Sequence, residues 1–135
     1  MDEKAGKILR GQSIEQVLGD SEEISPFTTD IETDTVSNEE YRDVLWTGDQ
    51  MQLVLMSVDP DDSIPLEKHE KGDQFICVEE GEVKVSIGEE EDDLNYKENL
   101  SADDAVIIPA GYWHIVEVVS DKPAKLYLLY APPEH

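Results

Sequence analysis

The sequence contains a single cysteine, Cys77, so the chain cannot form an internal disulfide. It also lacks any apolar run that approaches the roughly 18 residues needed to cross a bilayer. Its first residues, Met1 to Lys4, have neither the basic flank nor the apolar stretch of a secretion signal. From these absences we expect a cytoplasmic protein, with Cys77 as a small buried side chain in the apolar run 75–78.

Basic residues are scarce: 10 Lys and Arg stand against 33 Asp and Glu, for a formal net charge of −23. A surface of this sign repels nucleic acid phosphates and anionic membranes, so we expect neither as a partner. The acidity has two interpretations. It is either an adaptation to a salty cytoplasm, where ions screen the repulsion, or a patch that recruits a cationic partner.

With 135 residues, of which 39% are hydrophobic, the chain has the size of one domain with an apolar core. Residues 1–40 are polar and rich in acids, and we interpret them as an N-terminal arm. Within the arm, Ser13 and Gln16 have the spacing of a capping box, which predicts a short helix over 13–18 that ends at Gly19.

From residue 41 onward, short apolar or alternating runs are separated by turn residues, which is the pattern of an all-β domain. We predict about nine strands, spaced as in sandwiches and barrels, and no second domain. The predicted strands cover residues 44–46, 52–58, 64–69, 74–79, 82–87, 94–97, 105–108, 114–119 and 124–130. The fold class is therefore all-β, with a barrel domain over residues 41–135.

Four polar residues stand where apolar strands are expected to face inward. Glu67 and His69 are two apart on one predicted strand, so their side chains share a face. Gln74 opens the next strand after a short turn, and His114 opens a later strand after Pro-Ala-Gly. Polar side chains in an apolar interior are costly unless a partner satisfies them. One divalent metal ion would satisfy all four, and two imidazoles with a carboxylate are the donor set of non-haem iron sites.

Each of these signals also has a plainer interpretation. A Glu-x-His pair on a strand is usually a hydrogen-bonded or surface pair, and a single histidine after a turn is usually packed or exposed. The four groups together are also compatible with a polar pocket that holds no metal. Tyr112 and Trp113 flank His114. They either pack at the mouth of the barrel or, in the case of Tyr112, donate a proton to a substrate or contact it.

The spacing of these residues resembles the two motifs of the cupin superfamily. Gln74 precedes Gly81 as the glutamate of the first motif does, His69 matches its second histidine, and Glu67 replaces its first histidine. In the second motif, the turn 109–111 and His114 match without a gap.

The sequence departs from the cupin motifs at the two glycines that open them. Asp61 and Asp103 stand at these positions, and aspartate tolerates left-handed turn geometry better than most residues. Glu-x-His, Asp-Gln-Phe and Trp-His are similar to a subgroup of small bacterial and archaeal cupins with this variant ligand set. Members of that subgroup are described as relatives of mannose-6-phosphate isomerase.

The resemblance covers about residues 41–133 and implies the cupin double-stranded β-helix, a jelly-roll barrel. It implies one divalent metal ion (Fe, Mn, Zn, Ni or Cu) held by Glu67, His69, Gln74 and His114, with Tyr112 as a candidate catalytic residue. The implied function is that of a metalloenzyme acting on a small oxygen-rich molecule, by isomerisation or dioxygenation. A non-catalytic metal or small-ligand binding module is the alternative. Cupins usually dimerise through a sheet face, so we also expect a homodimer, in which the apolar run 44–46 is a candidate contact.

Overall fold

The computed structural model describes residues 24–133, and the predicted helix over 13–18 lies outside this range. Within it, all nine predicted strands are present, and eight of them keep both ends within one residue of prediction. The strands are β1 Asp43–Thr47, β2 Gln52–Val58, β3 Ser63–Lys68, β4 Asp73–Glu80, β5 Val83–Gly88, β6 Tyr96–Leu100, β7 Ala105–Ile108, β8 Trp113–Val118 and β9 Ala124–Ala131. β6 is displaced from its prediction because it is an edge strand with only Leu100 buried, so no apolar alternation marks its ends.

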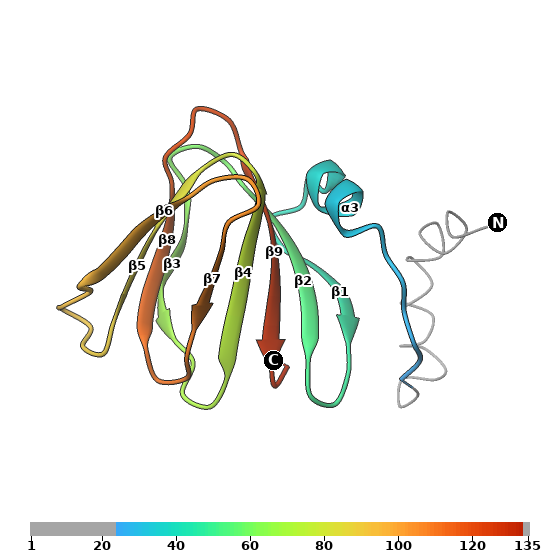
Figure 1. Cartoon of the computed structure of the whole chain (residues 1–135), viewed down its shortest axis with the longest axis horizontal. Helices are drawn as coiled ribbons and strands as arrows, with labels where there is room; N and C mark the ends of the chain where they lie inside the picture. Colours follow the sequence, from blue (N-terminus) through green and yellow to red (C-terminus); the bar gives the residue numbers. More distant parts are fainter. Residues whose placement is uncertain (1–23, 134–135) are drawn as a thin grey trace.

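The strands form two antiparallel sheets that face each other (Figure 1). The five-stranded sheet has the order β1-β2-β9-β4-β7, and the four-stranded sheet has the order β3-β8-β5-β6. Sequence neighbours are therefore often in different sheets, as in a jelly roll. The predicted all-β jelly-roll fold is confirmed. β3 and β9 end, and β4 and β8 begin, at the same end of the sandwich, the lower end in Figure 1.

The space between the sheets is apolar because alternate residues of each strand point inward. In β9, for example, Leu126 and Leu128 are fully buried, whereas Lys125 and Tyr127, which alternate with them, point outward. Cys77, on the outward side of β4, is buried as the sequence predicts. Polar inward residues are concentrated at the end of the sandwich where β3 and β9 stop.

The two aspartates that replace the motif glycines adopt left-handed backbone geometry. The φ angle is 70° at Asp61 and 76° at Asp103. The Asp103 turn is tied to β4, because its backbone N–H donates to the carbonyl of Val78 at 2.7 Å. Aspartate therefore serves where glycine is usual, as predicted.

A helix that the sequence analysis did not predict, α3 (Ile31–Ser37), packs against β4 and β9. Figure 1 shows it beside the five-stranded sheet, away from the four-stranded one. Asp30 caps its first turn by accepting from the N–H of Thr33. At its other end, Lys125 donates to the carbonyl of Asn38 at 2.6 Å. With 7 residues and no helical apolar period, α3 is stabilised by these tertiary contacts rather than by its own sequence.

The segment before α3 lies along the edge of the five-stranded sheet, where the indole N–H of Trp46 donates to the carbonyl of Ser25 at 3.0 Å. Leu45, in the run proposed as a dimer contact, is buried within the chain itself. No helix in residues 24–133 is long and apolar enough to cross a membrane.

Truncation of a core side chain should destabilise the fold much more than truncation of an outward one. Leu128 is 0% exposed and Ile107 is 67% exposed. We expect Leu128→Ala to lower the free energy of unfolding by about 2–5 kcal/mol, through lost burial and a cavity. Ile107→Ala, the matched control, should change it by less than about 0.5 kcal/mol. Urea unfolding measures both, and equal effects would contradict the assignment of the core.

The left-handed turn at Asp103 should accept glycine and resist a β-branched residue. Asp103→Gly should keep or raise the free energy of unfolding, because glycine has no strain at this φ. Asp103→Val should lower it by about 1–2 kcal/mol. Ala102→Val, one residue away with an ordinary φ, is the control in the same urea experiment. Wild-type stability in Asp103→Val would show that the turn imposes no such constraint.

Candidate metal centre

The end of β3 and the start of β8 bring the two central groups of the site together. Glu67 is paired in register with His114 across these strands. His69 lies just beyond β3, and its carbonyl accepts from the N–H of Gly111 at 2.8 Å. Gly111, with a φ of 88°, belongs to the turn before β8. This turn therefore precedes His114 and holds the backbone of His69.

The side chains of Glu67, His69 and His114 converge. One carboxylate oxygen of Glu67 lies 3.3 Å from Nε2 of His69 and 3.4 Å from Nε2 of His114. The imidazole centroids are 5.3 Å apart. The three ligand atoms all lie within 4.8 Å of one another, which is a separation that a single metal ion can bridge.

The ring of His114 is held in one orientation. It is 1% exposed, and its Nδ1 lies 3.2 Å from the carbonyl oxygen of Tyr112. A carbonyl can only accept, so Nδ1 carries the proton of this hydrogen bond. Nε2 is then the ring nitrogen that faces Glu67, which is the usual arrangement of a metal-binding histidine.

Gln74, the second residue of β4, is 2% exposed and faces the interior. Neither its amide oxygen nor its amide nitrogen has a hydrogen-bond partner in the described part of the chain. A buried amide with no partner is costly, and ligation of a metal through its oxygen would remove part of that cost. The donor set therefore fits a divalent ion, with Gln74 as a fourth ligand still a prediction.

The carboxyl group of Glu67 is acidic because of its neighbours. Partial burial by itself would raise its pKa, but hydrogen bonds and charge from His114 and His69 outweigh this and lower the pKa from 4.5 to about 2. At neutral pH, Glu67 is therefore an anionic oxygen between two imidazoles.

A family model for the cupin domain matches residues 54–130, which include all four of these residues. The chain belongs to the cupin family. The uncharacterized protein YrkC of Bacillus subtilis (strain 168) is 42% identical to it over 110 residues, or 82% of this chain and 59% of YrkC. This cupin thus spans little more than half the length of YrkC.

Two further proteins are similar to this cupin. The uncharacterized protein L612 of Acanthamoeba polyphaga mimivirus is 34% identical over 110 residues, covering 81% of this chain and 67% of L612. The crystal structure of BH2720 from Bacillus halodurans has a TM-score of 0.81 at 45% identity, covering 82% of this chain and 84% of that one. These similarities support the cupin fold across most of the described residues.

Two tyrosines lie near the candidate centre of this cupin, and the sequence analysis selected only one. Tyr112, the candidate catalytic residue, directs its hydroxyl to Glu89 at 3.3 Å. Tyr130 faces inward at the end of β9, and its ring packs edge-on against His69 at 5.5 Å between centroids. The strict alternation of β9 places Tyr130 on the inward face, and this alternation is the sequence signal that could have identified it. A catalytic role for Tyr112 stays a prediction.

Removal of one imidazole should return the carboxyl of Glu67 toward ordinary acidity. In metal-free His69→Ala, we expect its pKa to rise from about 2, because one donor is lost. His69 lies outside the strands, so the sheets remain intact. The measurement is a pH titration of the side-chain carboxyl ¹³C shift of Glu67.

Ile115→Ala is the control for this titration, since Ile115 is the residue after His114 on β8 and alternation turns it to the other face. An unchanged pKa in His69→Ala would contradict the assigned cause. Because the folded-state pKa is lowered, the stabilisation from Glu67 is present above about pH 4.5 and lost as the pH falls through about 2.

Proposed function

We propose that this cupin binds one divalent transition-metal ion and acts as a metalloenzyme on a small oxygen-rich molecule. The observation that carries the proposal is the position of one Glu67 oxygen, 3.3 Å from Nε2 of His69 and 3.4 Å from Nε2 of His114. A carboxylate and two imidazoles that converge at one end of an apolar sandwich have the chemistry of a metal site.

Each ligand has a distinct part in the proposed centre. Glu67 is the anionic anchor, and with it a divalent ion leaves a site charge of about +1. His69 and His114 are the imidazole ligands, and Gln74 is a weaker neutral ligand. Fe, Mn, Zn, Ni and Cu all accept this donor set, so supply and geometry select among them. When bound, the metal supplies Lewis-acid polarisation of a substrate oxygen or a centre for oxygen activation.

Neighbouring residues of the chain orient the candidate ligands and enclose the site. The Tyr112 carbonyl holds His114 in its ligating orientation, and the Gly111 N–H holds the backbone of His69. Tyr130 packs edge-on against the ring of His69, and both residues line one pocket. Isomerisation is supported by the resemblance to the mannose-6-phosphate isomerase-like subgroup, and dioxygenation by the donor set of non-haem iron centres.

Metal analysis followed by activity assays tests the function. Protein purified without added metal should contain about one equivalent of a divalent ion by mass spectrometry of the elements. Oxygen uptake with small diketones and catechols then tests dioxygenation, and interconversion of aldose and ketose phosphates tests isomerisation. Bound metal with no turnover in any assay would instead favour a non-catalytic binding module. Absence of metal after incubation with each candidate ion would overturn the proposed centre.

The anionic ligand should matter most for metal affinity. We expect Glu67→Ala to weaken binding of Zn²⁺ by at least about tenfold, and more than Gln74→Ala does, because it removes the only negative ligand. Glu117→Ala removes an exposed carboxylate from the outward side of β8 and is the control for charge. Competition with a chromophoric chelator measures the Zn²⁺ affinity of the wild type and of the three variants. Equal affinity in wild type and Glu67→Ala would remove Glu67 from the site.

Homodimerisation and the cytoplasmic location stay predictions, as does the exclusion of nucleic acid and membranes as partners. One apolar row crosses the outward face of the five-stranded sheet, where each residue is paired with the next in register. The row consists of Trp46, Leu53, Leu129, Phe75 and Ile107. The predicted dimer would form through the sheet face that carries this row.

A further inference from the structure

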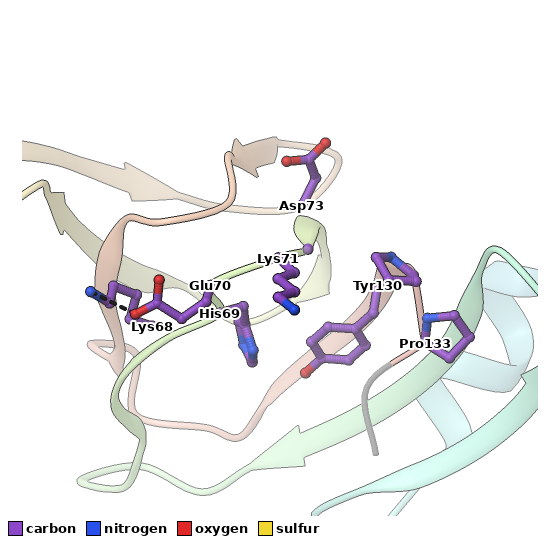
Figure 2. A pocket seen from close by; sticks show the side chains of 9 residues that line it. Lys68, His69, Glu70, Lys71, Asp73, Tyr130 and Pro133 are labelled. Carbon is purple, nitrogen blue, oxygen red and sulfur yellow. Dashed lines mark ion pairs between the residues drawn. The ribbon is translucent and has the colours of Figure 1, made fainter.

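A pocket opens beside the candidate metal centre, at the end of the sandwich where β3 meets β4. Its volume is about 240 Å³. His69 and Tyr130 form one part of its wall and connect it to the centre, while the β3–β4 turn and the C-terminal prolines form the rest. Figure 2 shows the rings of His69 and Tyr130 facing the same space, with the side chain of Lys71 extending toward it.

Two lysines and two carboxylates line this pocket, and they differ in their partners and directions. Lys68 is neutralised by Glu70 at 2.9 Å, and its ammonium lies over the ring of Trp113 at 5.2 Å. The carboxylate of Asp73 accepts from the N–H of Ala110 at 2.9 Å, and Figure 2 shows it directed away from His69 and Tyr130. Lys71 forms no ion pair within residues 24–133. The lining is therefore neutral in sum, and the ammonium of Lys71 is the charged group that extends toward the pocket without an ion pair among the described residues.

A lining without net negative charge is unusual for this chain. The formal net charge is −23, with only 10 basic residues. Beyond a distance of about 8–10 Å, salt screens the field of the remote acids, so a ligand in the pocket responds mainly to the groups that line it. An ammonium without an ion pair in a neutral lining can hold an anion there, although the whole molecule repels one.

We propose that this pocket binds a small oxygen-rich carboxylate, whose carboxylate group pairs with the ammonium of Lys71. The rest of the ligand then lies beside the rings of His69 and Tyr130, which line the pocket. The inference rests on the proposed metal centre, since His69 belongs both to that centre and to the lining of the pocket. It narrows the substrate class from oxygen-rich molecules in general to small organic acids.

The size of the pocket agrees with such a ligand. A volume of about 240 Å³ equals roughly eight water molecules at ~30 Å³ each. Pockets for drug-sized ligands begin at about 300 Å³. Short oxo acids and hydroxy acids are therefore of suitable size, and an ammonium is a strong hydrogen-bond donor to their carboxylate.

Calorimetric titration of the Zn²⁺-loaded protein tests the proposal. The probes are D-glycerate and pyruvate, with glycerol and hydroxyacetone as their neutral counterparts. We expect the acids to bind more tightly than the neutral compounds. Lys71→Gln should weaken binding of the acids by about tenfold, the usual effect of losing a charge-assisted hydrogen bond, and should leave the neutral compounds unaffected. Lys71→Arg should restore most of the affinity.

Lys97→Gln is the matched control, because it removes the same charge from an exposed position on the edge strand β6. Its affinity for the acids should equal that of wild type. Zinc content, measured separately in each variant, should be unchanged, which distinguishes the carboxylate pocket from the metal centre.

Three results would overturn the inference while the metal centre stands. The first is equal binding of the acids by wild type and Lys71→Gln, the second is binding of the neutral compounds as tightly as the acids, and the third is no binding of either acid. A wild-type protein that binds none of the candidate metals would overturn the proposed centre, and this inference with it.

Discussion

The cost of enclosing polar groups in an apolar sandwich is the constraint on which the site depends. The interior between the sheets is filled by aliphatic side chains, and an inward polar group can be tolerated only where it finds a partner. Glu67 finds two imidazoles, and His114 finds the carbonyl of Tyr112. The buried amide of Gln74 has no partner among the described residues. The proposed metal would give this amide oxygen a partner.

The β3–β4 turn and the β7–β8 turn hold the polar groups in place, and hydrogen bonds join the two turns. The β7–β8 turn donates from Gly111 to the carbonyl of His69 and from Ala110 to the carboxylate of Asp73. His69 and Asp73 flank the β3–β4 turn. Because the candidate ligands lie at strand ends held by backbone hydrogen bonds, the proposed metal would require little reorganisation. The same turns shape the adjoining pocket and present Lys71 to it.

The outward face of the five-stranded sheet is stabilised by a different set of contacts. There α3 covers part of β4 and β9, and Lys125 reaches from β9 to the carbonyl of Asn38 and the hydroxyl of Ser57. An outward lysine thus connects the segment before β1 to the sheet. The stability of this region is separate from the chemistry at the strand ends, since none of these contacts involves a candidate ligand.

The sequence by itself determined the strands, because alternation of apolar residues between turn residues is a local property of the chain. It also indicated the candidate ligands, since Glu67 and His69 share a face at a spacing of two and His114 follows a recognisable turn. It even located the left-handed turns at Asp61 and Asp103.

Only the tertiary structure decided which distant groups meet. It brought the tyrosine of β9 to His69, turned the hydroxyl of Tyr112 to Glu89, and left Lys71 without an ion pair among residues 24–133. It also created α3, which has no helical apolar period of its own. These features depend on contacts between residues up to 87 positions apart, such as Lys125 and Asn38. Local periodicity carries no information about such contacts, whereas sheet pairing fixes them through register.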